Sequence, residues 1–167
     1  TMNLVYLSIG TNLGNKIENL KNAISRLSSI VTIDSISSVY ETEPLNVQKQ
    51  DNFLNIAIEV QTNFPPLELI EKLKKIESEM GRVLSELNKP RIIDIDIIFY
   101  NSIILDEVRI QVPHPRAHKR AFVIFPIMDL NPAFVHPILN KSLMEISKNL
   151  SNQRISKLEN VDIEKIR

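Results

Sequence analysis

Residues 89–100 read Lys-Pro-Arg-Ile-Ile-Asp-Ile-Asp-Ile-Ile-Phe-Tyr, and the rest of the chain is organised around this stretch. It is rich in β-branched and aromatic residues and is followed by Asn101-Ser102, which predicts a strand that ends at this point. Side chains alternate between the two faces of a strand, so Asp94 and Asp96 share one face, with roughly 6–7 Å between their Cα atoms. The opposite face carries three isoleucines: Ile93, Ile95 and Ile97.

This pair of carboxylates has two interpretations. Unpaired carboxylates are costly in an apolar strand, so something cationic must meet them. In the first interpretation, Asp94 and Asp96 lie on a half-solvated face and form salt bridges with Arg or Lys, the more common outcome for an isolated Asp-x-Asp. In the second, they bind hard divalent cations, which take oxygen ligands and are completed by substrate phosphates. Arg91, just before the pair, mildly favours the second interpretation.

Composition narrows the class of protein. A chain of 167 residues predicts a single domain, residues 1–167. Lys+Arg and Asp+Glu both number 20, so we expect neither nucleic acid nor a membrane as a partner. The absence of cysteine excludes disulfides, thiolate metal sites and a cysteine nucleophile. No apolar run approaches the roughly 20 residues of a membrane-spanning helix and no signal peptide is visible, so the expected location is cytoplasmic.

Apolar spacing predicts the order strand, helix, strand, strand, helix, strand, followed by a helical tail. The first helix has Asn15 as its N-cap candidate, and the second begins after Pro65-Pro66 and ends at Gly81. The strands expected before the Asp94 strand are residues 3–10, 30–40 with a bulge near Ser35, and 53–61. The segments expected after it are a hairpin from Asn101-Ser102 into Ile103–Leu105, a helix over residues 122–130, and a helix that carries Leu143, Ile146 and Leu150.

Two βαβ crossovers in this order predict an α+β protein with the ferredoxin-like βαββαβ layout, an antiparallel sheet with both helices on one face. An extra hairpin and C-terminal helices would follow. The two helices would cover a stripe of four residues: Leu54, Ile56, Ile58 and Val60. The opposite, uncovered face would carry Phe53 and Asn55 and, from the neighbouring strand, Asp94 and Asp96.

Two loops can fold over that uncovered face, a polar one over residues 41–52 and a basic one over residues 109–120. The basic loop contains Arg109, His114, Arg116, His118, Lys119 and Arg120. Such a density of Arg and His suits an oligophosphate, because guanidinium binds phosphate bidentately, although a solvated basic loop explains it equally well. Together, the face and its loops predict a site for two substrates, a flat heterocycle and a metal–polyphosphate.

Glu77 lies at the edge of the apolar stripe of the second helix, one turn after Leu73. The stripe itself consists of Leu69, Leu73, Ile76 and Met80. On periodicity alone, Glu77 is predicted to lie on a solvated flank of that helix.

Seven motifs now identify a known family. They are Gly10-Thr-Asn-Leu13, Tyr40-Glu-Thr-Glu-Pro-Leu45, Gln50-Asp-Asn-Phe-Leu-Asn55, Glu77-x-x-x-Gly-Arg82, Pro90-Arg-Ile-Ile-Asp-Ile-Asp-Ile97, Val112-Pro-His-Pro-Arg116 and Arg120-Ala-Phe122. In these motifs the chain resembles the 6-hydroxymethyl-7,8-dihydropterin pyrophosphokinases of the folate pathway. The resemblance covers nearly the whole chain and implies transfer of pyrophosphate from ATP to a pterin alcohol, with AMP as the product. It also implies that the chain is fused to, or works beside, a neighbouring folate-pathway enzyme.

The resemblance further implies roles for individual residues. Asp94 and Asp96 would ligate two Mg2+ ions that also bind the phosphates of ATP, the co-substrate. Arg82 and Arg91 would clamp these phosphates and complete a catalytic group of four. The pterin pocket would consist of Thr42, Leu45, Phe53, Asn55 and Phe122. The remaining ATP-binding residues would be Glu77, Ile97 through its backbone, Arg109, Ile110, Gln111, His114 and Arg120.

One loop departs from the family pattern, which usually reads Arg-x-x-x-Arg-Trp-Gly-Pro-Arg. Here Leu84 stands at the second arginine and Asn88 at the tryptophan. Residues 81–89 have few apolar side chains and no period, so we expect them to act as a lid. Two alternatives to the pyrophosphokinase stay open at this point. One is another two-metal enzyme, such as a palm-type nucleotidyltransferase, and the other is a non-enzymatic ferredoxin-like module that binds a ligand.

Overall fold

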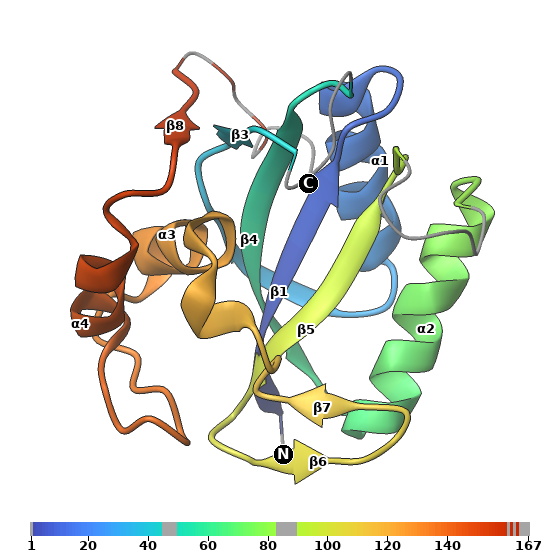
Figure 1. The fold of residues 1–167 in the computed structure, drawn as a ribbon. Helices are drawn as coiled ribbons and strands as arrows, with labels where there is room; N and C mark the ends of the chain where they lie inside the picture. The colour runs from blue at the N-terminus through green and yellow to red at the C-terminus, as the bar shows by residue number, and fades with distance from the viewer. Residues whose placement is uncertain (1, 45–49, 83–89, 160, 162, 164–167) are drawn as a thin grey trace.

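An antiparallel sheet forms the centre of the protein (Figure 1). The computed structural model describes residues 2–44, 50–82, 90–159, 161 and 163, so Leu45, Leu84 and Asn88 lie outside the described residues. Within the described ranges, the sheet has six strands in the order β5-β1-β4-β3-β8, and β2 also pairs with β4. The strands are β1 (Asn3–Thr11), β2 (Thr32–Ile36), β3 (Tyr40–Thr42), β4 (Phe53–Thr62), β5 (Asp94–Tyr100) and β8 (Ile155–Lys157).

One face of the sheet is covered by α1 (Lys16–Ser28) and α2 (Pro66–Glu79). Both helices begin as expected, because the side chain of Asn15 accepts a hydrogen bond from the backbone of Glu18, and Pro66 occupies the first turn of α2. The alternating stripes of β1, β4 and β5 pack beneath these helices in one apolar core. The predicted stripe of β4 is buried in this core: Leu54, Ile56, Ile58 and Val60.

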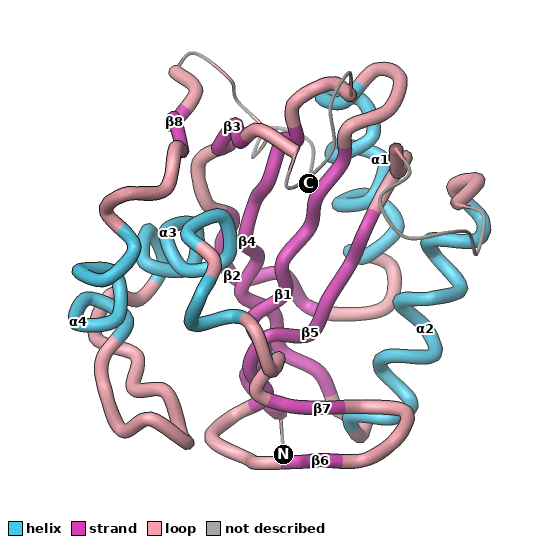
Figure 2. Tube along the Cα trace, viewed as in Figure 1, coloured by secondary structure: helices cyan, strands magenta, loops and turns pink. Residues whose placement is uncertain are grey.

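The opposite face is less open than expected. Figure 2 shows α3 (Ala121–Leu130) and α4 (Leu143–Ser147) on the side of the sheet away from α1 and α2. These helices form a second core with Tyr6, Ala57 and Phe99, whose side chains project from the sheet toward them. The expectation of a wholly uncovered face was therefore wrong. Apolar C-terminal helices need a surface to bury against, and the sheet provides it.

The extra hairpin is present, but its strands differ from the prediction. β6 (Leu105–Asp106) pairs with β7 (Gln111–Val112) and not with β5. Asn101 does form a turn, with φ of 48°, and β5 ends just before it. The strand expected over residues 30–40 is divided into β2 and β3, and the pairing of β2 shifts between Ile33 and Ser35, as the predicted bulge requires.

The C-terminal part adds one strand that the sequence analysis did not predict. β8 pairs with the edge strand β3, so that Thr42 lies opposite Ile155. Among the described residues, no helix is both long enough and apolar enough to cross a membrane.

Candidate active site

The candidate site lies at one end of the sheet, where β5, β1 and β4 run side by side. Gly10 of β1 lies between the two halves of the site, because it pairs with Asp94 of β5 on one side and with Asn55 of β4 on the other. Ser8 pairs with Asp96 in the same register. Adjacent strands are about 4.8 Å apart, so Asp94 and Asn55 lie two strand spacings apart, on the order of 10 Å.

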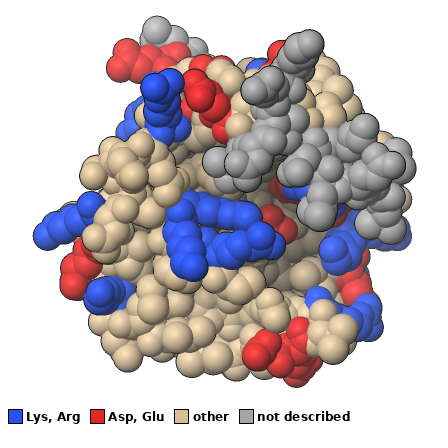
Figure 3. All heavy atoms as spheres, in the orientation of Figure 1, with Lys and Arg blue, Asp and Glu red and all other residues tan. Residues whose placement is uncertain are grey.

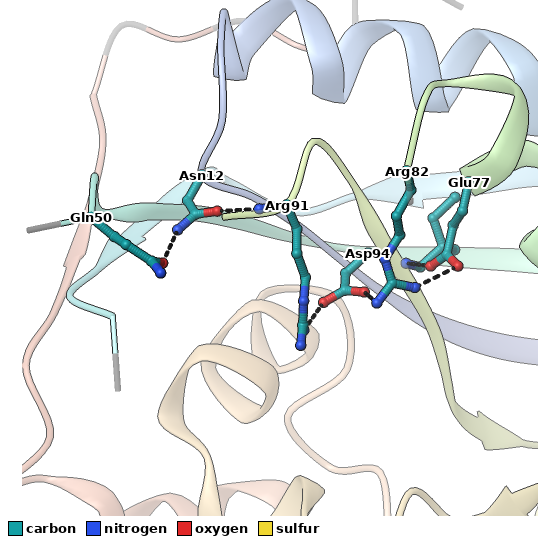
Figure 4. A network of polar contacts seen from close by, with 7 residues as sticks. Asn12, Gln50, Glu77, Arg82, Arg91 and Asp94 are labelled. Atoms are coloured by element: carbon teal, nitrogen blue, oxygen red, sulfur yellow. Dashed lines mark hydrogen bonds and ion pairs between the residues drawn. The ribbon is translucent and has the colours of Figure 1, made fainter. Parts of the chain in front are cut away.

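Two arginines form ion pairs with Asp94, one with each of its carboxylate oxygens (Figure 4). Nη1 of Arg91 lies 2.6 Å from Oδ2 of Asp94, and Nη2 of Arg82 lies 3.0 Å from Oδ1. Arg82 also donates from Nη1 to Oε1 of Glu77, at 2.9 Å. The two guanidinium groups therefore balance the negative charges of Asp94 and Glu77. For Asp94, this is the salt-bridged arrangement of the first interpretation of the Asp94–Asp96 pair.

Glu77 is buried, which corrects the prediction of a solvated flank. Glu77 is only 5% exposed to solvent. Its carboxylate oxygen Oε2 accepts a hydrogen bond of 2.7 Å from the backbone N–H of Ile95. β5 is an edge strand, so Glu77 satisfies a donor that no further strand can pair. Burial raises the pKa of Glu77 and Asp94 adds to this, while the bonds from Ile95 and Arg82 oppose it.

Asp96 differs from Asp94 in having an accessible carboxylate. Its residue is exposed, and the described residues offer no side chain that forms a hydrogen bond or ion pair with it. Burial among the surrounding protein atoms and the negative charges of Asp94 and Glu77 raise its pKa to about 6. Because the carboxylate still reaches water, the two negative neighbours are the firmer cause of this shift.

On the other side of Gly10, three predicted pterin residues come together. Asn55 is buried, and its Nδ2 donates to Oγ1 of Thr42 at 3.0 Å. This bond leaves Oδ1 of Asn55 facing Gly10. Phe53 is half-buried and lies beside the same glycine. Phe122 belongs to a different element, the first turn of α3, where its ring lies 5.5 Å from the guanidinium carbon of Arg120.

Basic side chains from the segment before α3 approach the aspartates. Arg120 is close enough to interact electrostatically with Asp94, Asp96 and Arg116, and burial and Arg116 are the main causes that lower its pKa. His114 is tied to β5, since its backbone N–H donates to the carbonyl of Ile98 at 3.0 Å. Figure 3 shows blue Lys or Arg atoms gathered beside red carboxylate atoms near the middle of this face.

Three other predicted ATP residues lie beyond the end of β5. Arg109, Ile110 and Gln111 belong to the β6–β7 hairpin, which follows the end of β5 opposite Asp94 (Figure 1). Arg109 forms an ion pair with Glu71 of α2, and Ile110 is buried in the main core. The structure thus brings together Arg82, Arg91, Asp94 and Glu77, whereas the hairpin residues form a separate group.

Asn12 forms hydrogen bonds on both sides of the site, and the sequence analysis did not single it out. It is 2% exposed, and its Oδ1 accepts a hydrogen bond of 2.7 Å from the backbone N–H of Arg91. Its Nδ2 donates to Gln50 at 3.1 Å, so one side chain joins the segment before β5 to the loop before β4 (Figure 4). The signal was its place in the Gly10–Leu13 motif, because a buried amide in a turn must have partners.

One end of the antiparallel sheet therefore carries a carboxylate pair with arginines on one side of Gly10, and an amide with an aromatic side chain on the other. A few placed polar groups beside an aromatic side chain are typical of a protein that binds small molecules. Comparison with known protein families then identifies the family of this chain. Residues 6–132 match the family described as 7,8-dihydro-6-hydroxymethylpterin-pyrophosphokinase (HPPK), and the chain belongs to this family. The resemblance stated from the motifs is thereby confirmed.

Individual relatives agree with this assignment. The chain is 39% identical over 144 residues to the 2-amino-4-hydroxy-6-hydroxymethyldihydropteridine pyrophosphokinase of Aquifex aeolicus, covering 86% of this chain and 90% of that protein. It is 42% identical over 150 residues to the folic acid synthesis protein FOL1 of Dictyostelium discoideum, covering 90% of this chain but only 23% of that protein.

Solved structures show the same fold. The wild-type HPPK-DHPS of Plasmodium falciparum superimposes with a TM-score of 0.75 at 17% identity, over 96% of this chain and 51% of that one. At this level of identity the likeness concerns the fold alone. The chain therefore spans about half the length of this structural neighbour and less than a quarter of FOL1.

Proposed function

We propose that this chain transfers pyrophosphate from ATP to the hydroxymethyl group of 6-hydroxymethyl-7,8-dihydropterin and releases AMP, a step of folate synthesis. The observation that carries the proposal is the position of Asp94, which forms ion pairs with Arg82 and Arg91 and lies across Gly10 from Asn55. The family match favours this reaction over a nucleotidyltransferase or a non-enzymatic module. The net charge of zero also argues against a nucleic-acid substrate.

We assign the sheet to the ferredoxin-like layout. Support comes from the strand order β5-β1-β4-β2, with α1 between β1 and β2 and α2 between β4 and β5. In this assignment β3 and β8 extend the sheet beyond the basic unit, beside the proposed pterin pocket.

Asp94 and Asp96 fit a pair of Mg2+ ions. They lie on one face of β5, and the raised pKa of Asp96 reflects negative charge that a cation would balance. Among the described residues no group of three or more His, Cys, Asp or Glu could hold a metal ion by itself. This suits ions that take their remaining ligands from substrate phosphates and water. When bound, such ions would supply neutralisation of charge on the phosphoryl oxygens.

The protein's own contribution would be positioning and positive charge. The hydroxymethyl oxygen bonds to the β-phosphorus, the bond from that phosphorus to the α–β bridging oxygen breaks, and this oxygen leaves with AMP. The hydroxyl proton passes to water. Arg82 and Arg91, which reach Asp94 in this structure, would donate to the phosphoryl oxygens as negative charge moves between them.

The pterin would lie against Phe53 and Phe122, with its polar edge on Asn55. The bond between Asn55 and Thr42 fixes the amide so that its oxygen and remaining N–H have defined directions. A buried amide held in this way discriminates strongly, because a ligand that leaves it unpaired loses about 1–3 kcal/mol.

Incubation with ATP, Mg2+ and the pterin alcohol tests the proposal. We expect AMP and the pterin pyrophosphate in equal amounts, with no product when either the pterin or Mg2+ is omitted. ADP as the nucleotide product would indicate transfer of a single phosphoryl group and contradict the proposal. AMP released without pterin would indicate a hydrolase.

We also propose that this unit works in association with a neighbouring folate enzyme. Support comes from relatives in which the matched segment is part of a longer chain, such as the folate synthesis bifunctional protein of Arabidopsis thaliana, which is 39% identical over 132 residues. The bifunctional protein FolKE of Lactococcus lactis is 39% identical over 131 residues, which are 38% of its length.

A further inference from the structure

The first turn of α3 is capped by a side chain from a distant part of the chain. The N-cap residue is Arg120, and its side chain makes no capping hydrogen bond. Instead, the backbone N–H of Ala121 donates to Oε1 of Gln153 at 2.9 Å, across 32 residues of sequence. Nε2 of Gln153 donates at 2.8 Å to the carbonyl of Lys119. One amide group therefore holds the backbone on both sides of Arg120.

The chemistry of Arg120 explains why the cap comes from elsewhere. N-cap positions favour Ser, Thr, Asp and Asn, whose oxygens accept from the first free N–H groups of a helix. A guanidinium has five donors and no acceptor, so Arg120 cannot cap α3. Its side chain instead takes part in the charge group of Asp94 and Asp96. A separate acceptor is then required, and Gln153 provides it.

The same segment is also attached to the opposite side of the proposed pterin pocket. Ile155 of β8 pairs with Thr42 of β3, the residue that holds the Asn55 amide. Lys157 Nζ lies 3.6 Å from Asp129 of α3 and 5.6 Å from the centre of the Tyr40 ring of β3. Residues 153–157 thus connect the start of α3 with β3, and they lie beyond residues 6–132, which match the family.

We propose that Gln153 is a positioning residue for the pterin site, which sets where Phe122 lies relative to Thr42 and Asn55. This inference rests on the proposed function, because it assigns Phe122 to the pterin. Phe122 is one residue after the backbone N–H that Gln153 holds, so loss of the cap moves the ring directly. The long side chain of Arg120 can adjust its rotamers to a small backbone shift, whereas a stacked ring cannot.

The test compares Gln153→Met with Gln153→Glu and with Gln61→Met. Met keeps the length of the side chain but makes neither hydrogen bond, while Glu keeps the acceptor for Ala121 and loses the donor to Lys119. Gln61 is the matched control, since its side chain donates a hydrogen bond to Asp34 at the end of β4 away from Phe53. Steady-state kinetics of AMP release and hydrogen exchange of the Ala121 amide are measured on each variant.

In Gln153→Met we expect the KM for pterin to rise about fivefold with kcat within about twofold of wild type, because saturating pterin restores the bound position. The Ala121 amide should exchange faster. Gln153→Glu should raise KM less than Gln153→Met, and Gln61→Met should change neither quantity.

Three results would overturn the inference: an unchanged KM in Gln153→Met, an equal rise in Gln61→Met, or Ala121 exchange at the wild-type rate. Failure of the proposed function gives a different result, since the wild-type protein would then release no AMP in a reaction that depends on pterin. A Gln153→Met protein in which kcat falls and KM stays constant would also contradict a positioning role.

Discussion

A Cβ atom placed on Gly10 would lie 2.9 Å from Oδ1 of Asn55. The backbone of Gly10 does not need glycine for its conformation, because the positive φ angles of glycines belong to Gly14 and Gly81. The requirement is for space on the face that carries the site. Glycine at this position lets the Asn55 amide lie against the backbone of β1 while Asp94 pairs with the same residue from the other side.

Gly10→Ala is therefore expected to displace the Asn55 amide and break its bond with Thr42. Overpacking of this kind costs about 1–3 kcal/mol of unfolding free energy. Pterin affinity should fall by about tenfold or more, since a misplaced amide leaves a polar edge unpaired. Urea unfolding and titration of pterin, in the presence of a non-hydrolysable ATP analogue, measure the two effects.

A double-variant cycle isolates the contact as the cause. Asn55→Ala removes Oδ1, so Gly10→Ala should cost little additional stability in that background. An equal cost in both backgrounds would show that Gly10 is required for some other reason.

Asp96→Ala should abolish turnover and leave the protein folded. Its carboxylate is exposed and has no bonded side-chain partner in the described part of the chain, so its loss removes no structural contact. Loss of a metal ligand is expected to cost several kcal/mol of transition-state stabilisation. AMP release at saturating Mg2+ is the measurement, with Glu18→Ala on α1 as the control for loss of an exposed carboxylate. Turnover near wild type would exclude Asp96 from the site.

Alternation along the strands was sufficient to predict that Asn55 and Asp94 lie on the face of the sheet away from the stripe that α1 and α2 cover. Asn55 and Asp94 project from the same face because period two follows directly from strand geometry. The pairing that places both beside Gly10 could not be predicted in this way, since register depends on the loops and the buried faces together.

Contacts made across the fold account for the errors. Glu77 is buried because the N–H of Ile95 faces it from an edge strand, and helical periodicity contains no information about that donor. The turn at Asn101 was correctly placed, but a turn signal does not identify which strands will pair, and β6 pairs with β7. β8 has only three residues, which are too few to show the alternation of apolar and polar side chains that predicts a strand.

The environment of His114 should make the free energy of unfolding depend on pH. Burial, followed by the charges of Arg120 and Arg116, lowers its pKa to about 4. The native state thus binds this proton less readily than the unfolded chain, whose histidine titrates near 6.5. Stability from His114 is complete above pH 6.5 and is lost as the pH falls toward 4. In the wild-type protein, Nδ1 of His114 accepts a hydrogen bond from the backbone N–H of Arg116. The side-chain oxygen of Asn in His114→Asn keeps an acceptor for this N–H.

Wild-type protein should therefore lose about 1–2 kcal/mol more unfolding free energy between pH 7.5 and pH 5 than His114→Asn, allowing for the partial exposure of the imidazole. Urea unfolding at the two pH values measures this. Parallel losses in both proteins would assign the acid sensitivity to carboxylates instead.

Arg82→Ala should have two separable effects. Arg82 binds Glu77 at 2.9 Å and Asp94 at 3.0 Å, so its removal leaves the buried Glu77 carboxylate with only the N–H of Ile95. Breaking a buried pair in this way costs roughly 2–4 kcal/mol of unfolding free energy. We also expect kcat to fall much more than ATP affinity, as for an interaction made in the transition state.

Adding Glu77→Gln separates the structural effect from the catalytic one. Gln keeps an oxygen for the N–H of Ile95 and removes the buried charge, so stability should recover in Arg82→Ala/Glu77→Gln. Turnover should stay low, because no guanidinium is available for the phosphoryl oxygens. Single-turnover assays beside equilibrium ATP titrations measure the two properties. Turnover that recovers with stability would limit Arg82 to a structural role, and equal losses of ATP binding and turnover would make it an ordinary ground-state contact.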